Sequence, residues 1–207
     1  MSSPTRRAPR SWTSAGSSTC ASTPTSTRSA SEEAPETLMG GVLASLARID
    51  RATLRGARRA TGAVPGAGRA LATFSRLGEH GAVWLAIGSA GALARPARRR
   101  EWLTATATVF GVYVLNTAVK FSVRRRRPIE ADLPALVDTP TQLSFPSAHA
   151  ATGFAGARLY SRLGLPRGPL NALAGALALS RVALGVHYPS DVLAGAALGR
   201  LLAAARR

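Results

Sequence analysis

Cysteine, acidic side chains and aromatic rings are all scarce in this chain of 207 residues. Its one cysteine, Cys20, cannot form an internal disulfide, and no metal cluster can be built on cysteine ligands. Only 10 Asp and Glu residues stand against 27 Lys and Arg residues, which leaves a net charge of +17. That charge favours two interpretations: basic flanks beside membrane helices, or attraction to anionic lipid headgroups and phosphates.

The shortage of aromatic residues, 5% of the chain, also bears on nucleic acid. Single-stranded nucleic acid is commonly bound by basic side chains interleaved with aromatic ones. The basic residues of this chain are not interleaved in that way, and its later segments are apolar. We therefore expect no nucleic acid partner.

The first 36 residues contain no continuous apolar run. They are dominated by Ser, Thr, Pro, Arg and Ala, with Trp12 as the only aromatic residue. Such a segment offers little apolar surface to offset the entropy of ordering, so we predict that residues 1–36 form a disordered tail. Because Ser, Thr and Pro interrupt every short apolar run, the apolar region of a secretory signal is missing, and we expect the N-terminus to stay in the cytoplasm.

Apolar residues recur at helical spacing from about residue 37, and arginines fill the other positions. This pattern predicts an amphipathic helix over residues 37–60 that lies on a membrane surface. The segment 61–68, with three glycines and a proline, then breaks the helix. The apolar positions are Leu38, Met39, Val42, Leu43, Leu46 and Ile49.

Five further apolar stretches are separated by connections that carry Arg or Pro. Most are near the lower limit of the ~17–25 residues that a spanning helix needs, so a membrane bundle and the core of a soluble helical protein are both open. Small residues such as Gly195 and Gly199 suit close helix packing in lipid. We therefore favour an all-α integral membrane bundle of five to six helices, within one domain over residues 37–207. The stretches cover 78–94, 102–120, 148–164, 168–186 and 192–205, and so place the bundle over 78–205.

Three short motifs lie at the ends of these stretches. If successive helices alternate in direction, all three fall at the same face of the bundle. Together they supply three fixed cations, two histidines and one carboxylate. The motifs are Lys120 with Arg127 and Pro128; Pro146, Ser147, Ala148 and His149; and Ser180 and Arg181 with His187 and Asp191.

This set of side chains suits phosphoryl transfer, because a transferring phosphoryl group spreads negative charge over its oxygens. Arg127 and Arg181 offer planar bidentate donors, and Lys120 offers a point charge. The hydroxyl of Ser147 is a further donor. Helix N-termini near Ser147 and Pro189 can direct free N–H groups at the same anion.

An imidazole can attack phosphorus first and split a slow hydrolysis into two easier steps. We predict that His187 is the nucleophile and that Asp191, four residues later, orients it and stabilises the cation formed. His149 is then available to protonate the leaving oxygen and later to activate water. One histidine starts neutral and the other protonated, so a bell-shaped pH profile is expected.

These motifs resemble those of the type 2 phosphatidic acid phosphatase superfamily, which also includes vanadium-dependent haloperoxidases. The family pattern is Lys, six residues, Arg-Pro; then Pro-Ser-Gly-His; then Ser-Arg, five residues, His, three residues, Asp. The C-terminal half of this chain matches it, except that Ala148 replaces the glycine in the phosphate-binding motif. An alanine there would be strained if the position needed a positive φ, and unstrained at a helix start. The resemblance implies dephosphorylation through a phosphohistidine, without metal or cofactor, in a bundle usually of six helices.

Several polar residues also have simpler interpretations. Arginines 124–126 are predicted to be a membrane-flanking charge run, and only the register of the motif and Pro128 distinguish Arg127 from them. Asp191 also suits a helix N-terminus. His80, with Glu79, is predicted to mark the membrane interface, and Asn116 to make a helix-packing hydrogen bond.

The main hypothesis is a multi-pass plasma (inner) membrane phosphatase acting on a lipid-linked phosphomonoester or pyrophosphate. A polyprenyl-linked substrate of the cell envelope is favoured, and phosphatidic acid or phosphatidylglycerol phosphate stays open, as does a homo-oligomer. The alternatives are a vanadate-dependent haloperoxidase and a catalytically silent membrane protein that binds anionic lipid. Arginines are slightly more numerous in the loops on the catalytic side, which indicates a cytoplasmic active site.

Overall fold

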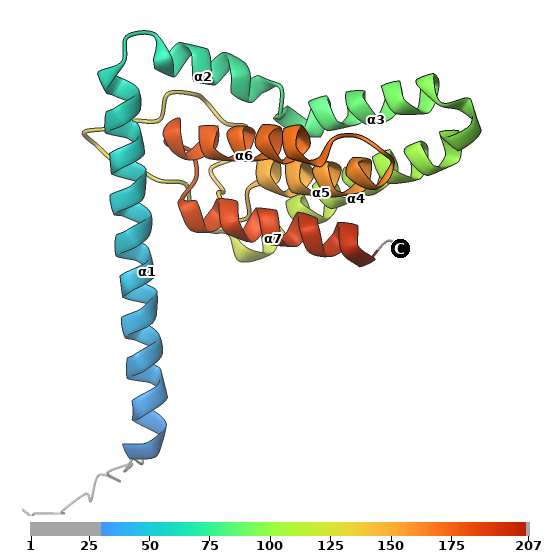
Figure 1. The fold of residues 1–207 in the computed structure, drawn as a ribbon. Helices are drawn as coiled ribbons and strands as arrows, with labels where there is room; N and C mark the ends of the chain where they lie inside the picture. Colours follow the sequence, from blue (N-terminus) through green and yellow to red (C-terminus); the bar gives the residue numbers. More distant parts are fainter. Residues whose placement is uncertain (1–29, 206–207) are drawn as a thin grey trace, which may run out of the picture. The chain divides into compact units, whose positions relative to one another are not determined.

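The computed structural model describes residues 30–205, with side chains from residue 40 onwards, and this part of the chain is helical apart from turns, loops and one isolated bridge between Arg126 and Leu143. The described residues from 41 onwards form one compact unit. The α-helices are α1 (Ala30–Ala63), α2 (Ala67–Arg76), α3 (Ala82–Ala94), α4 (Arg99–Val123), α5 (Ala148–Arg162), α6 (Arg167–Ala183) and α7 (Pro189–Ala205), and two short 3-10 helices, η1 (Glu79–Gly81) and η2 (Pro96–Arg98), precede α3 and α4 (Figure 1).

All five predicted apolar stretches are helical, as α3 to α7. The N-terminal part differs from the prediction in two ways. Helix α1 begins at residue 30, inside the segment expected to be disordered, whereas residues 1–29 lie outside the described residues. The predicted break is narrower, because the chain turns at residues 64–66 through a left-handed Gly66 and then forms α2, which was not predicted.

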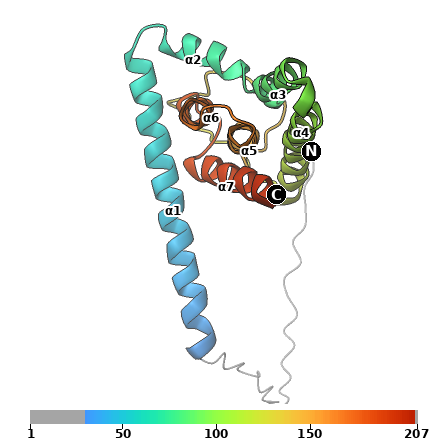
Figure 2. The ribbon, with the colours of Figure 1, turned by 45° about the vertical axis from the view of Figure 1, so that its right-hand side comes forward.

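Helix α5 is the centre of the bundle. It packs against α3, α4, α6 and α7, and 10 of its 15 residues are buried (Figure 2). Two tryptophans, Trp84 from α3 and Trp102 from α4, are fully buried in the same hydrophobic cluster as Tyr160 of α5. These three are the largest fully buried side chains of the described residues. Glycines permit these close approaches: a Cβ atom on Gly156 would lie 2.5 Å from the Trp84 ring, and one on Gly195 would lie 2.4 Å from the Ser147 carbonyl oxygen.

Helix α1 is attached to this bundle by a few specific contacts. Leu54 is buried in a small cluster with residues of α5, α6 and α7. Arg55 forms ion pairs with Glu130 and Asp132 in the long loop between α4 and α5, and Arg58 donates a hydrogen bond of 2.7 Å to the Pro134 carbonyl. The placement of α1 on a membrane surface stays a prediction.

Within the described residues, the segment Pro96–Val123 is the one helical region both long and apolar enough to cross a membrane by length and composition. Its outer surface carries large apolar side chains, including Phe110, Val114 and Phe121, each more than half exposed. Such a surface suits contact with lipid.

Candidate active site

The structure brings the three sequence motifs together around one cavity of about 290 Å³. The cavity lies where α4 ends, α5 begins and α6 ends, beside the loop between α6 and α7. Ser147 and Asp191 lie directly behind it, both with no exposed surface. The predicted site residues that line the cavity are Lys120, Arg127, Ala148, His149, Arg181 and His187.

Arg127 is the cation most firmly held in place. Between the end of α4 and Pro128 the chain becomes extended, and the Arg127 N–H donates to the Gln142 carbonyl at 2.9 Å. Its guanidinium donates to the carbonyls of Thr141 (2.8 Å) and Val186 (2.7 Å), and its Nη1 lies 3.2 Å from Nε2 of His187. Burial, with a smaller effect of the nearby Arg181 charge, lowers the pKa of Arg127 to about 10, so it remains a cation at neutral pH.

The other two cations approach from different helices. Lys120 Nζ donates to the Leu143 carbonyl at 3.3 Å, and Arg181 Nη1 donates to Ser75 Oγ at 2.7 Å. Both side chains are more than nine-tenths buried. Buried cations repel each other, so this arrangement is suited to an anion that binds between them and offsets the repulsion.

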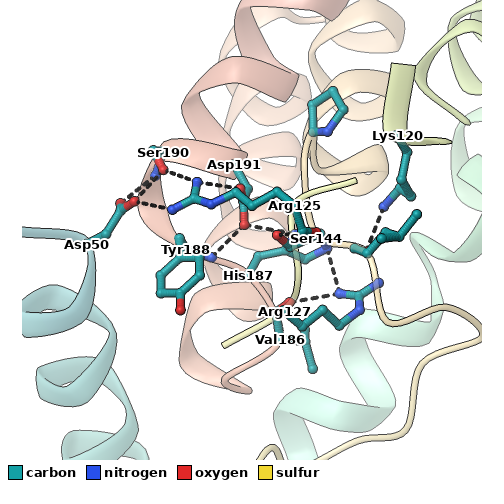
Figure 3. Close-up of polar contacts among 12 residues, drawn as sticks. Asp50, Lys120, Arg125, Arg127, Ser144, Val186, His187, Tyr188, Ser190 and Asp191 are labelled. Carbon is teal, nitrogen blue, oxygen red and sulfur yellow. Dashed lines mark hydrogen bonds and ion pairs between the residues drawn. The ribbon is translucent and has the colours of Figure 1, made fainter. Parts of the chain in front are cut away.

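His187 lies between the cations and Asp191 (Figure 3). Because Arg127 donates towards Nε2, that nitrogen carries the lone pair and faces the cavity, whereas Nδ1 faces Asp191. The Nδ1 to Oδ2 distance is 3.6 Å, which is a close charge contact longer than a hydrogen bond. Burial lowers the pKa of His187 to about 4 although Asp191 opposes this shift, and the imidazole is therefore neutral and nucleophilic at pH 7.

His149 lies in the first turn of α5. Its Nε2 is 3.0 Å from the carbonyl oxygen of Ser75, so Nε2 carries a proton and Nδ1 is the nitrogen available for proton exchange. Gly78 makes room for the ring, because a Cβ atom there would lie 2.5 Å from Cδ2 of His149. The preceding Ser147 takes the N-cap position, and its Oγ has no hydrogen-bond partner in the part of the chain that the structure describes.

Ala148 begins α5 with helical backbone, and the non-glycine residues with positive φ in the described chain are His80 and Arg124. The replacement of the family glycine by alanine therefore causes no backbone strain. Asn116 donates to the Pro146 carbonyl at 3.3 Å, which is a packing contact beside the site, as predicted.

Glu79 and His80, expected to mark the membrane interface, also line the cavity, where His80 packs edge-on against Tyr113, and their place at the interface stays a prediction. The prediction for Arg125 was wrong. Arg125, expected to be part of a flanking charge run with Arg124 and Arg126, instead forms an ion pair with the buried Asp191. Ser75 of the unpredicted α2, which contacts both His149 and Arg181, was also missed, since nothing in its local sequence marks it.

Arg125 connects Asp191 to α1 (Figure 3). Its Nη1 donates to Asp191 Oδ1 at 2.8 Å and to Ser190 Oγ at 2.6 Å, and its Nη2 donates to Asp50 Oδ2 at 2.8 Å. The guanidinium lies over the Tyr188 ring, 4.4 Å from its centroid. Burial alone would lower the pKa of Arg125, but the hydrogen bond to Asp50 and the charge of Asp191 outweigh it and raise that pKa.

Comparison with known proteins finds relatives of one family. Residues 101–206 match the sequence model of the PAP2 superfamily. The chain is 48% identical over 132 residues to the decaprenylphosphoryl-5-phosphoribose phosphatase of Mycobacterium tuberculosis, covering 63% of this chain and 73% of that protein. It is 43% identical over 149 residues to the protein of that name from Mycolicibacterium smegmatis, covering 72% and 82%. A transmembrane PAP2-type phosphatidylglycerolphosphate phosphatase from Bacillus subtilis has the same fold, with a TM-score of 0.60 at 24% identity, covering 83% of this chain and 92% of that one.

Proposed function

This chain belongs to the PAP2 superfamily and is a metal-independent lipid phosphate phosphatase, and we propose that its substrate is a decaprenyl-linked sugar phosphate such as decaprenylphosphoryl-5-phosphoribose. Two relatives with 43–48% identity over most of their length carry the name of that activity. The observation that carries the proposal is the convergence of Lys120, Arg127 and Arg181 on one cavity with Nε2 of His187.

The first half of the reaction transfers the phosphoryl group to the enzyme. The three cations bind the phosphomonoester dianion, and Arg127 exchanges its contact with His187 Nε2 for a phosphate oxygen. Nε2 then attacks phosphorus, and a P–N bond forms while the bond from phosphorus to the sugar oxygen breaks. The negative charge of the bound phosphate favours a second proton on His149, at Nδ1, and His149 gives this proton to the departing oxygen, so the sugar leaves as an alcohol.

The second half releases phosphate. His149, now neutral, accepts a proton from a water molecule that attacks the phosphohistidine, and the P–N bond breaks to give inorganic phosphate. Throughout, the Asp191 carboxylate faces Nδ1 of His187 and stabilises the positive charge that the ring carries when Nε2 is phosphorylated. The unpartnered hydroxyl of Ser147 and the free N–H groups of the first turn of α5 are further donors for phosphate.

The membrane setting follows from the substrate. A decaprenyl chain remains in the bilayer, so the cavity must lie near the headgroup level, as it does if α4 spans the membrane and Lys120 lies at one end of it. We infer from the slight excess of arginines in the loops on this side that the active site faces the cytoplasm. In a Cys20→Ser background, single cysteines at the exposed positions 131 and 97 test the orientation: an impermeant maleimide should label Ala97→Cys but not Ala131→Cys in intact cells. The reverse pattern would place the active site outside the cytoplasm.

The test of the function is phosphate release by purified protein in EDTA from a panel of lipid phosphates. The panel contains decaprenylphosphoryl-5-phosphoribose, undecaprenyl pyrophosphate, phosphatidic acid and phosphatidylglycerol phosphate. We expect EDTA-resistant turnover that is highest on the first substrate and is abolished in His187→Ala. Turnover that survives this substitution would refute the nucleophile, and a higher rate on a glycerophospholipid would refute the substrate.

A further inference from the structure

Asp191 is a fully buried carboxylate, so each of its oxygens needs a partner. Oδ2 accepts a hydrogen bond of 2.9 Å from the Tyr188 N–H and faces His187 Nδ1 at 3.6 Å. Oδ1 accepts the bond of 2.8 Å from Arg125. Arg125 therefore fixes which oxygen is turned towards the histidine.

Arg125 is itself held by a residue outside the matched segment 101–206. Asp50 of α1 is only 5% exposed, and it accepts a hydrogen bond from Nη2 of Arg125. Asp50 also accepts hydrogen bonds from the Ser190 N–H, at 2.9 Å, and the Ser190 hydroxyl, at the start of α7 (Figure 3). A carboxylate at a helix N-terminus is favourable, so Asp50 binds the cation and the first turn of α7 together.

We propose that Asp50 is a positioning residue for the reaction, acting through Arg125 on the orientation and charge of Asp191; this rests on the proposed phosphohistidine mechanism. If Asp50 loses its charge, Arg125 has Asp191 as its one remaining carboxylate partner among the residues that contact it here. More of the Asp191 charge is then neutralised by Arg125, and less is left to stabilise the imidazolium that forms when His187 attacks. The effect falls on the transition state rather than on the binding of phosphate.

A merely structural role would give a different result. Asp50 also helps to attach α1, but so does Arg55, which lies on the same helix and pairs with Glu130 and Asp132 without contacting Arg125. Arg55→Gln is therefore a matched control that removes an ion pair between α1 and the bundle and leaves the Asp50, Arg125 and Asp191 contacts in place.

The experiment compares kcat and KM on a short-chain lipid phosphomonoester. Asp50→Asn is expected to lower kcat about tenfold and to change KM by less than about twofold, because a small displacement of a catalytic group is enough for such a loss. Asp50→Glu, which keeps the charge, should recover part of kcat, and Arg55→Gln should resemble the wild type. An unchanged kcat in Asp50→Asn, or an equal loss in Arg55→Gln, would overturn the proposal.

Orthovanadate separates this proposal from the choice of substrate, because it forms a five-coordinate phosphate analogue at the nucleophile without turnover. We expect its Kd to rise about tenfold in Asp50→Asn and to stay unchanged in Arg55→Gln. A wild-type protein that hydrolyses no lipid phosphate would refute the proposed function, and the vanadate titration would still test Asp50. Equal Kd values for wild type and Asp50→Asn would refute the positioning role.

A second cavity, of about 350 Å³, lies at the other end of α5 and is lined by four arginines from three helices. They are Arg158, Arg162, Arg167 and Arg200, and no carboxylate is among the seven residues that line the cavity. Along α5, Arg158 and Arg162 lie about 14 and 20 Å beyond His149 at 1.5 Å per residue. No described residue lines both cavities, so this one is distinct from the active site. After Asp138 the sequence has one acidic side chain, Asp191, which is already paired with Arg125.

The arginines of this cavity are partly arranged in advance. The Arg200 guanidinium lies 4.6 Å from the centroid of the Phe154 ring, and its Nη2 donates to Asn171 at 3.4 Å. Nε of Arg158 is buried and has no hydrogen-bond partner within the described chain. The Arg162 guanidinium donates to the Ala203 carbonyl at 3.0 Å. Guanidinium groups that share one cavity repel each other, and a phosphate group that accepts from Nε of Arg158 relieves this repulsion.

From this cavity we infer a binding site for the phosphate group of an anionic membrane lipid at the face opposite the active site. Its volume is in the range of small-ligand sites, and planar guanidinium groups from three helices suit the oxygens of a phosphate headgroup. Inorganic phosphate shares this chemistry and is distinguished by the test.

The test is native mass spectrometry of detergent-purified protein with phosphatidylglycerol and phosphatidylcholine. The double variant Arg158→Gln/Arg200→Gln should bind phosphatidylglycerol about tenfold more weakly than wild type. The control Arg99→Gln/Arg100→Gln, with the same charge change at the same face but outside the cavity, should bind it normally. Equal losses in both, or no preference over phosphatidylcholine, would overturn the lipid site, and displacement of the lipid by millimolar inorganic phosphate would assign the site to the free anion.

Discussion

Replacing Gly195 by alanine should destabilise the protein and slow the reaction, because α7 lies directly on the backbone of α5. The added Cβ would lie 2.4 Å from the Ser147 carbonyl oxygen and 3.2 Å from the Ala150 Cβ, whereas ordinary contacts begin at 3.4 Å. A backbone carbonyl cannot rotate out of the way, so α7 must move by about 1 Å, and overpacking of this kind costs about 1–3 kcal/mol. The shift also stretches the 2.9 Å bond from the Ser147 N–H to the Asp191 carbonyl, which joins the two catalytic helices.

Gly175 on α6 provides the matched control, because a Cβ atom there meets nothing within 4 Å. Gly175→Ala should be neutral or stabilise by up to about 1 kcal/mol, since it removes backbone freedom from the unfolded chain. The two variants should therefore differ by about 1–4 kcal/mol, or about 2–16 °C in Tm for a chain of this size, with a lower kcat for Gly195→Ala alone. Thermal unfolding in detergent and initial rates measure both effects. A Gly195→Ala protein as stable and as active as Gly175→Ala would refute the close packing.

Three further predictions concern the site. Arg127→Lys should lower kcat/KM about 100-fold, because a point charge cannot replace the guanidinium that contacts two carbonyls and His187, whereas Lys at the exposed position 126 should leave steady-state kinetics unchanged. The His187 pKa is about 4 in the folded state and 6.5 ordinarily, so the unfolded chain binds a proton first as the pH falls. This one residue should therefore lower stability by on the order of 2 kcal/mol between pH 7 and 5, and His187→Gln should make the fall in Tm over this range smaller by that contribution. Gly78→Ala should displace the His149 ring and lower kcat with little change in KM, whereas Gly62→Ala, which has open space, should behave as wild type in the same assay.

Five of the helices could be predicted because apolar stretches of their length are typical of helices and too long for strands. Helices α3 to α7 follow the predicted stretches closely. Helix α2 could not. Its ten residues follow a glycine-rich turn and have no long apolar pattern, and its position depends on packing against α6. The role of Ser75 therefore could not be predicted from the sequence. Its carbonyl accepts a hydrogen bond from His149, and its hydroxyl accepts one from Arg181. Tertiary contacts of a short helix decide such a role, and no local signal records them.

The run of arginines from 124 to 127 shows why the charge partner of Asp191 was missed and how it could have been found. Helix α4 ends at Val123, and Arg124 adopts a left-handed conformation with φ 55°. Beyond it the backbone is extended, since the Arg127 N–H donates to the Gln142 carbonyl and the Ser144 N–H donates to the Arg125 carbonyl. Side chains alternate in extended chain, so Arg125 and Arg127 face the site while Arg124 and Arg126 are exposed. Pro128 already indicates extended backbone at Arg127. In an extended segment, residues two apart in the sequence lie on the same side, so Arg125 faces the same way as Arg127 and is the second cation of the site. A helix would place the same four arginines on different faces, which is why the charge-run interpretation missed Arg125.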